Sequence, residues 1–375
     1  MELPILTVQS GLPQTGLDSF HDDRRKSRQV MVGDIAVGGG APISVQSMTK
    51  TKTGDVKATL EQIRRVEEAG CDIIRVTVND WEAAEAMKEI VAGSKIPVVA
   101  DIHFNHIFAI KALEAGVAKV RLNPGNIGSI ERIHQVLSLA KERRVPIRIG
   151  VNSGSLEKDI LEKHGYPTAE ALFESAMRHV DICEDFGFGD IIISVKSTDV
   201  RLMIAAYRLI AERTDYPLHL GVTEAGTMRV GTIKSSVGIG TLLAEGIGDT
   251  IRVSLTDEPE KEIEVGKEIL RSLSLASRNV EIIACPTCGR LEIDLFKVCD
   301  ELERATNHLK KPVKVAILGC VVNGPGEAAD ADIGIAAGQG VGILYRKGVV
   351  IRRIKESEIV PVLIEEITNF QPDVN

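Results

Sequence analysis

From about residue 30, the chain repeats one pattern of hydrophobic and polar positions: a short apolar run, a polar turn and an amphipathic stretch of helical period. In one such stretch Leu60, Ile63 and Val66 share a face that excludes Glu67 and Glu68. The apolar runs predict eight strands: Ile43–Met48, Ile73–Val78, Val98–Ile102, Lys119–Leu122, Ile147–Val151, Ile191–Val195, Leu218–Val222 and Ile251–Leu255.

Strands that are apolar on both faces and alternate with helices are typical of a parallel sheet. Eight of them predict an α/β fold, closed into a (β/α)8 TIM barrel. An open doubly wound sheet is the competing arrangement. It usually has fewer strands, and no Gly-x-Gly-x-x-Gly follows the first strand, so the barrel is favoured.

The pattern changes after Ser272. Residues 280–284 and 313–318 are predicted strands on either side of an amphipathic helix over 289–305, and such a βαβ unit brings its strand ends to one edge. Three more strands are expected at 333–336, 342–345 and 349–354, before a helix over 358–370. We therefore predict three regions: a polar N-terminal tail (1–28), the barrel (29–272) and a smaller α+β domain (273–375).

Composition narrows the function. The net charge is −8 and aromatic residues make up 3% of the chain, which argues against a nucleic-acid-binding protein built on basic patches and stacking rings. We see no apolar core for a signal peptide before Arg28, and no later run long enough to span a bilayer. A cytoplasmic protein with neither nucleic-acid nor membrane partners is expected. Residues 22–26, Asp-Asp-Arg-Arg-Lys, are expected to be solvated.

Five cations interrupt strands that should be apolar: Arg75, Arg121, Arg148, Lys196 and Arg252. For any single position a structural ion pair is an equally good explanation. Five together favour a cationic mouth, because buried unpaired charge is costly and active sites of this fold lie at the C-terminal ends of the strands. Since arginine suits phosphate oxygens, the predicted ligand is a small phosphorylated molecule.

Polar side chains accompany these cations, and as a ring they would form a substrate cage. Each alone is more often a loop cap than a catalyst. Glu224 is the first choice for acid–base chemistry, because a carboxylate among cations is poorly suited to binding phosphate. The full set is Gln46, Ser47, Thr49, Asp101, His103, Asn123, Asn152, His219, Glu224 and Ser254.

The six cysteines do not form a disulfide framework. Three of them, Cys71, Cys183 and Cys299, are expected to be inert core thiols. The other three lie in Gly- and Pro-containing turns at strand ends, where the backbone can approach a metal closely. These are Cys285 and Cys288 of a Cys-x-x-Cys pair, and Cys320.

Glu327 is the candidate fourth ligand beside these three cysteines. Structural zinc is the alternative that local spacing leaves open. No second Cys-x-x-Cys pair or nearby histidine pair completes a zinc ribbon, and a cationic barrel needs a chemically active partner, so an iron–sulfur cluster is favoured. A carboxylate ligand would be the more easily displaced from iron.

Five runs of sequence carry a resemblance to a known family: 45–49 (VQSMT), 99–104 (VADIHF), 121–126 (RLNPGN), 221–226 (GVTEAG) and 319–327 (GCVVNGPGE). In their content and order they resemble the bacterial 4-hydroxy-3-methylbut-2-enyl diphosphate synthases. The resemblance extends from about Arg24 to the C-terminal helix.

The resemblance implies reductive ring opening and dehydroxylation of 2-C-methyl-D-erythritol 2,4-cyclodiphosphate, in the methylerythritol phosphate route to isoprenoids. It implies a 4Fe-4S cluster on Cys285, Cys288, Cys320 and Glu327, electrons from a flavodoxin or ferredoxin, and a head-to-tail homodimer. It also assigns proton handling to Glu224. The residues that would hold the diphosphate are Arg75, Arg121, Arg148 and Lys196, with Asn123, Asn152 and Ser254 as hydrogen-bond partners.

Two other functions remain open from the residues alone. One is a cluster-dependent dehydratase that acts on a phosphorylated polyol without net reduction. The other is a zinc-stabilised, non-catalytic phosphate-binding protein. The metal content distinguishes the zinc-stabilised protein from the cluster-dependent dehydratase. The need for a reductant distinguishes the dehydratase from the synthase.

Overall fold

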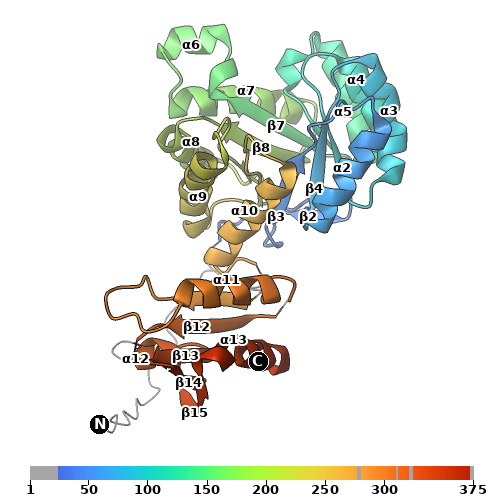
Figure 1. Ribbon diagram of the computed structural model, residues 1–375. Coiled ribbons are helices and arrows are strands. Elements are labelled where there is room, and N and C mark those ends of the chain that lie inside the picture. The colour runs from blue at the N-terminus through green and yellow to red at the C-terminus, as the bar shows by residue number, and fades with distance from the viewer. Residues whose placement is uncertain (1–23, 277–279, 310, 321–323, 372–375) are drawn as a thin grey trace. The chain divides into compact units, whose positions relative to one another are not determined.

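The computed structural model describes residues 24–276, 280–309, 311–320 and 324–371. The chain divides into two compact units, with the boundary between Ala276 and Ser277 (Figure 1). Each unit has a hydrophobic core of its own.

The N-terminal unit contains an eight-stranded parallel sheet in the order β8-β7-β6-β5-β4-β3-β10-β9. A parallel bridge between Ile193 and Leu218 connects the two ends of this order, so the predicted TIM barrel is confirmed. The strands are β3 (Ser44–Met48), β4 (Ile73–Thr77), β5 (Val98–Asp101), β6 (Lys119–Arg121), β7 (Ile147–Asn152), β8 (Ile191–Lys196), β9 (His219–Leu220) and β10 (Thr250–Ile251).

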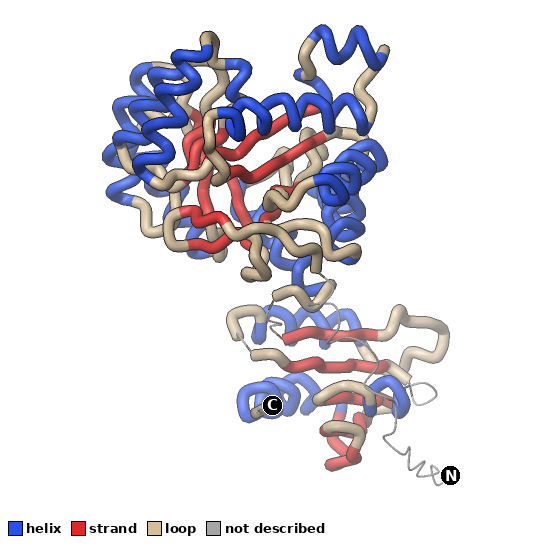
Figure 2. Tube along the Cα trace, turned by 180° about the vertical axis from the view of Figure 1, so that it is seen from behind, coloured by secondary structure: helices blue, strands red, loops and turns tan. Residues whose placement is uncertain are grey.

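Helices surround this sheet on the outside, as Figures 1 and 2 show. They begin where the sequence supplies caps: the Asp55 and Asp80 carboxylates accept hydrogen bonds from the amides of Ala58 and Ala83, at 3.0 and 2.8 Å. The helices are α2 (Val56–Glu68), α3 (Trp81–Gly93), α4 (His106–Glu114), α5 (Ile130–Arg143), α6 (Lys158–His164), α7 (Ala169–Asp185), α8 (Val200–Arg213), α9 (Met228–Ala244) and α10 (Pro259–Ser272).

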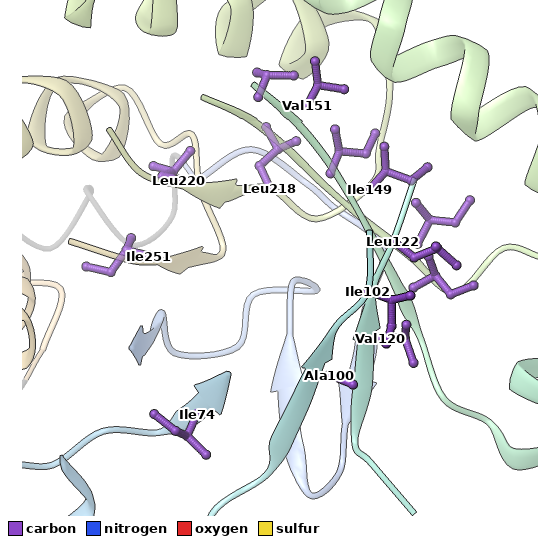
Figure 3. Close-up of a cluster of buried hydrophobic side chains, with 14 of the residues drawn as sticks. Ile74, Ala100, Ile102, Val120, Leu122, Ile149, Val151, Leu218, Leu220 and Ile251 are labelled. Carbon is purple, nitrogen blue, oxygen red and sulfur yellow. The ribbon is translucent and has the colours of Figure 1, made fainter. Parts of the chain in front are cut away.

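Alternate strand residues separate the barrel into two environments. Ile74, Val120, Ile149 and Ile251 belong to the apolar core that includes the helices, and Figure 3 shows part of this cluster. Because successive side chains of a strand point to opposite faces, the positions next to them face the barrel interior. Those interior positions include all five predicted cations.

An apolar hairpin plugs the N-terminal end of the barrel. Its strands β1 (Val30–Val32) and β2 (Ile35–Val37) pair antiparallel, and Val30, Val32 and Val37 form a buried cluster with interior residues of the barrel strands. The barrel residues of this cluster are Ile73, Val99 and Ile192. The interior is thus apolar at this end, and its polar groups lie closer to the C-terminal ends of the strands.

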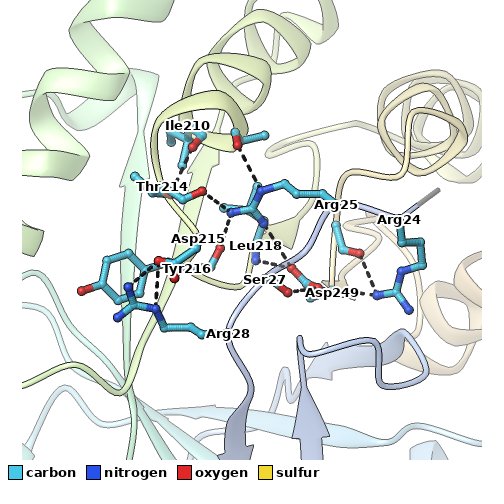
Figure 4. A network of polar contacts seen from close by, with 12 residues as sticks. Arg24, Arg25, Ser27, Arg28, Ile210, Thr214, Asp215, Tyr216, Leu218 and Asp249 are labelled. Carbon is cyan, nitrogen blue, oxygen red and sulfur yellow. Dashed lines mark hydrogen bonds and ion pairs between the residues drawn. The ribbon is translucent and has the colours of Figure 1, made fainter. Parts of the chain in front are cut away.

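Residues 24 and 25 correct one expectation, because they are not solvated (Figure 4). The Arg24 guanidinium donates to the carbonyl of Ala41 at 2.7 Å, and that of Arg25 donates to the carbonyl of Tyr216 at 2.8 Å. Both arginines also pair with Asp249, at 3.5 and 3.8 Å. Asp249 is buried and accepts from the Leu218 amide at 2.8 Å, so it needs cationic partners. Residues 22 and 23 lie outside the described residues.

The C-terminal unit is a mixed five-stranded sheet in the order β11-β12-β13-β14-β15. As predicted, the strands on either side of the helix are parallel neighbours, with Ala284 opposite Ile317. The strands are β11 (Val280–Ala284), β12 (Val313–Leu318), β13 (Ile333–Gly338), β14 (Val341–Arg346) and β15 (Val349–Lys355), and the helices are α11 (Leu295–Thr306), α12 (Gly324–Ala329) and α13 (Ile359–Asn369).

Helix α11 starts later than its hydrophobic pattern suggested. It begins at Leu295 rather than Gly289, because the Asp294 carboxylate accepts the amide hydrogen of Lys297 at 3.2 Å and caps the helix there. The preceding residues form a loop after the Cys-x-x-Cys pair.

Candidate active site

Three of the predicted cations, Arg75, Arg121 and Arg148, lie around one buried carboxylate inside the barrel. Asp101, the last residue of β5, is 3.6 Å from Nε of Arg75 and 3.4 Å from Nη1 of Arg121. Burial alone would raise the pKa of Asp101, but the charges of Arg75, Arg121 and Arg148 outweigh it and lower that pKa to about 2. One carboxylate therefore faces several cations, and the region carries excess positive charge.

Two glycines make room for these long side chains. A Cβ at Gly150 would stand 2.7 Å from Nε of Arg121, and a Cβ at Gly221 would stand 2.7 Å from Nζ of Lys196. Both distances are shorter than van der Waals contact, so a larger residue at either position would displace a cation. For Arg121 and Lys196, the sequence therefore supplies glycine at the position that the long side chain crosses.

Arg121 and Asn123 are held by the same stretch of β7. The Gly150 carbonyl accepts from Nη2 of Arg121 at 2.7 Å and from Nδ2 of Asn123 at 3.2 Å, while the Gly150 amide donates to Oδ1 of Asn123 at 2.8 Å. The guanidinium of Arg148, which is 1% exposed, donates to the Ser194 hydroxyl at 2.5 Å. These hydrogen bonds fix the positions of the donors before any ligand binds.

Arg252 has a partner that sequence reasoning missed. Glu262 of α10 is 1% exposed, and its carboxylate lies 3.7 Å from Nε of Arg252. The same carboxylate accepts from the Ser47 hydroxyl at 2.8 Å and from the Leu255 amide at 3.0 Å. Glu262 thus ties β3, β10 and α10 together. The helical period could have found it, because Glu262 shares the buried face of α10 with Val265 and Ile269, whereas Glu264 and Glu268 lie on the exposed face.

Four other predicted residues lie at the end of a barrel strand or in the loop after it. His103 follows β5 and is exposed, Asn152 ends β7, and Ser254 follows β10; the last two are half-buried. Burial and nearby cations lower the pKa of His103, although Asp101 opposes the shift. Glu224 follows β9, is exposed and has a left-handed backbone with φ of 50°, a strained conformation that clusters at functional sites.

Three interior polar residues lie deeper than expected. Gln46 and His219 do not occupy strand ends: Gln46 is in the middle of β3 and His219 begins β9. Both are fully buried. The third, Lys119, was not recognised as a buried cation. Lys119 precedes Arg121 by two residues on β6, so both side chains point to the same face of the strand. This alternation would have identified Lys119 as a second interior cation.

In the C-terminal unit, the thiols of the Cys-x-x-Cys pair and Cys320 follow the same edge of the sheet. Cys285 follows β11, and its amide donates to the Ile317 carbonyl of β12 at 3.4 Å; Cys320 comes two residues after β12. Nε of Arg290 donates to the Cys288 thiol at 3.4 Å. The pKa of Arg290 is raised by that hydrogen bond and by the charges of Cys288 and Cys320.

The chemistry of these thiols suits a metal or cluster. Arg290 lowers the pKa of the exposed Cys288 thiol, which favours the thiolate that binds metals. Burial raises the pKa of Cys71 and of Cys183 to about 12 in each case, so both are unreactive, as expected. Cys299 differs from these two because it is only half-buried; burial and then the nearby Cys285 raise its pKa.

In the part of the chain that the structure describes, the predicted ligands do not form a metal site. Within these residues no three His, Cys, Asp or Glu side chains are close enough to hold a metal ion. Thr287, between the first two cysteines, has a left-handed backbone with φ of 61°, and Glu327 is exposed in the first turn of α12. The segment 321–323 lies outside the described residues. The ligand assignment stays a prediction.

Comparison with known families covers both units. The GcpE TIM-barrel domain matches residues 27–267, and the GcpE protein C-terminal domain matches residues 281–369. This chain belongs to the GcpE family. The family was already indicated by the sequence runs quoted above, and both of its domains are present.

Curated relatives of this GcpE-family chain share a single name, 4-hydroxy-3-methylbut-2-en-1-yl diphosphate synthase (flavodoxin). The protein from Symbiobacterium thermophilum is 57% identical over 92% of this chain and 93% of its own length. Those from Clostridium perfringens and Geobacillus thermodenitrificans are 56% and 55% identical, each over 92% of this chain and over 99% and 92% of their own lengths. None of the helices in the described residues is long and apolar enough to cross a membrane.

Proposed function

We propose that this chain is an oxidoreductase that converts 2-C-methyl-D-erythritol 2,4-cyclodiphosphate into 4-hydroxy-3-methylbut-2-enyl diphosphate. The observation that carries this proposal is the group of buried cations around Asp101, at the ends of barrel strands where substrates of this fold bind. The GcpE domains and the name shared by the relatives support the same reaction.

The barrel residues bind and orient the diphosphate. Arg75, Arg121, Arg148, Lys196 and Arg252 neutralise its charge, with Asn123, Asn152, Ser254 and His103 as hydrogen-bond partners at the strand ends. Asp101 keeps Arg75 and Arg121 apart and oriented. Because these side chains are already fixed by β-strands and by each other, little conformational entropy is lost when the substrate binds.

Glu224 handles the proton that the reaction requires. The ring bond between carbon and phosphate oxygen breaks, the neighbouring hydroxyl leaves as water, and a double bond forms between the two carbons, so that two electrons and one proton are consumed. A hydroxyl leaves more readily when protonated, and Glu224 follows β9 on the side of the barrel where the substrate is expected. Its left-handed backbone is a strained conformation of the kind that occurs at functional sites.

A 4Fe-4S cluster would be held by Cys285, Cys288, Cys320 and Glu327. The three thiols fit this group because they follow one sheet edge and Arg290 favours the thiolate form of Cys288. When bound, such a cluster supplies electrons one at a time. A flavodoxin or ferredoxin is the proposed donor to the protein, in keeping with the name of the relatives.

We also propose a head-to-tail homodimer, and one surface supports self-association. Helix α9 exposes Val230, Ile233 and Val237, which are 48%, 57% and 53% accessible. After Arg229 the fully exposed positions of this helix are uncharged, and its other charged residue, Lys234, is half-buried. An apolar face with so few charges can meet its own copy with little repulsion between like charges, although the chain as a whole is acidic. Sedimentation should show a dimer that Ile233→Glu weakens and Lys88→Glu does not.

The test of the activity is anaerobic turnover of the cyclodiphosphate by the full chain with a flavodoxin and its reductase. We expect iron and sulfide in the protein, and product only when reductant is present. Equal turnover without reductant would instead support a dehydratase. Protein that contains zinc without iron or sulfide would support a phosphate-binding protein.

A further inference from the structure

Below the cations of the candidate site lies a second group of polar residues that the proposed reaction does not use. Lys119, Gln46 and His219 are each 0% exposed. Nζ of Lys119 donates to Oε1 of Gln46 at 3.2 Å. Lys119 pairs in register with Val99, and Val99 packs on the hairpin that plugs the barrel. Arg121 is the next interior residue of β6, and it pairs in register with Asp101.

The charges that face Lys119 are strongly unbalanced. The plug below it contributes apolar side chains, and the neighbouring interior strands, within the described residues, contribute cations together with the carboxylate of Asp101. Another buried carboxylate, that of Glu262, pairs with Arg252. The interior groups, strand by strand, are Gln46 (β3), Arg75 (β4), Asp101 (β5), Arg121 (β6), Arg148 (β7), Lys196 (β8), His219 (β9), and Arg252 after β10.

Several buried polar atoms in this group also lack a hydrogen-bond partner among the described residues. They are Nε and Nη2 of Arg148, Nε2 of Gln46, and both ring nitrogens of His219. Native proteins seldom leave buried donors unsatisfied, because each costs about 1–3 kcal/mol. Unsatisfied donors in a region of excess positive charge are suited to an anion.

Burial and the charges of Arg148 and Arg75 both disfavour the ammonium form of Lys119, so its pKa is well below the usual range. His219 is affected in the same direction by burial and by Lys196, Arg148 and Lys119. Where a buried lysine is neutral in the free protein, it has one lone pair available for a proton.

We infer that Lys119 is a further anion-binding residue, which takes up a proton when the diphosphate enters the barrel. This inference rests on the proposed substrate. The incoming negative charge offsets Arg148 and Arg75, whose charges, after burial itself, make a charged Lys119 unfavourable. Lys119 then binds as an ammonium group, and the proton comes from solvent.

The sign of the pH dependence follows from this linkage. Where Lys119 is neutral in the free protein and protonated in the complex, binding consumes one proton, so affinity falls as pH rises. The dissociation constant should then increase about tenfold per pH unit over that interval. Each phosphorus of the cyclodiphosphate carries one ester and one anhydride linkage, and its single acidic oxygen is ionised near neutral pH, so a proton taken up on binding goes to the protein.

The experiment is calorimetric titration of the full chain, with its cluster and without reductant, using the cyclodiphosphate in buffers of different ionisation enthalpy. For the unmodified chain we expect uptake of up to about one proton per site. Lys119→Met should remove the uptake and flatten the pH dependence. Lys119→Arg should bind without uptake, since arginine stays charged in both states. Circular dichroism and thermal unfolding establish that each variant is folded.

Lys88→Met, on the exposed face of α3, is the matched control and should leave the proton uptake unchanged. The inference is overturned if the unmodified chain takes up no proton, if Lys119→Met takes up as many, or if His219→Gln alone abolishes the uptake. Sulfate, which has no proton to exchange near neutral pH, serves as a second probe. Proton uptake with sulfate but no binding of the cyclodiphosphate would overturn the proposed substrate and leave the role of Lys119 standing.

Discussion

The barrel interior carries its cations on or beside parallel strands, and the cysteine edge of the C-terminal sheet carries Cys285, Cys288 and Cys320 just after parallel strands. The two regions position these reactive side chains in different ways. The barrel cations stand on or directly beside the strands, and Asp101, Gly150 and Ser194 fix three of them. The thiols stand in loops, and Thr287 between them has a left-handed backbone. Strands can preorganise an anion site without its ligand, whereas loop thiols need the group that they bind to bring them together.

The largest expected effect tests the cysteine edge. Cys320→Ser should lose the cluster and all turnover, because serine oxygen is a poor replacement for a thiolate ligand. Iron and sulfide content, visible absorbance and product formation measure this. Cys183→Ser is the control, since its thiol is buried in the barrel core and should retain both cluster and activity. The reverse result would reject the ligand assignment.

The barrel side of the comparison is tested by Arg148→Ala. Removing a charge-assisted hydrogen bond should weaken cyclodiphosphate binding by about 1.5–3 kcal/mol, with the cluster content unchanged. Calorimetric titration gives the affinity, and Arg143→Ala, exposed at the end of α5, is the control. Unchanged affinity would make Arg148 a structural residue of the barrel.

Asp101 gives a pH-dependent test of the same preorganisation. Its pKa is lowered to about 2, so its contribution to stability is fully present above about pH 4 and is lost as pH falls toward 2. The contribution is about 2 kcal/mol, obtained from the shift at 1.36 kcal/mol per pKa unit. Denaturant unfolding as a function of pH should show this loss in the unmodified chain and in Asp34→Asn, whose side chain is exposed in the turn between β1 and β2, and not in Asp101→Asn.

The smallest expected effect concerns strain in the cysteine loop. Thr287→Gly should stabilise the cluster-free protein by about 1 kcal/mol, because glycine adopts a left-handed backbone without the steric cost that a β-branched residue meets. Thermal unfolding of the cluster-free chain measures the gain, and Thr214→Gly, at an extended position, should destabilise. No gain for Thr287→Gly would mean that the loop relaxes when the cluster is absent.

Local sequence was sufficient for the eight strands and for most of the candidate site. Arg75, Arg121 and Arg148 were found because they interrupt apolar strands, and the period-two alternation of the folded strands puts all three on the interior face. The βαβ order likewise predicted that Cys285 and Cys320 would follow neighbouring parallel strands, as they do. Helix α11 was misplaced at its start because hydrophobic periodicity continues through a loop, whereas the cap at Asp294 decides the boundary.

Only the tertiary structure showed which partners these side chains have. Glu262 binds Ser47 from 215 positions away, Asp249 receives Arg24 and Arg25 from the other end of the barrel unit, and Lys119 reaches Gln46 across the barrel. Such pairs depend on closure of the sheet, which brings distant segments together, and no short-range pattern encodes them. The sequence by itself determined which faces and edges carry charge and thiols; the fold decided which charges are compensated and which are left to bind an anion.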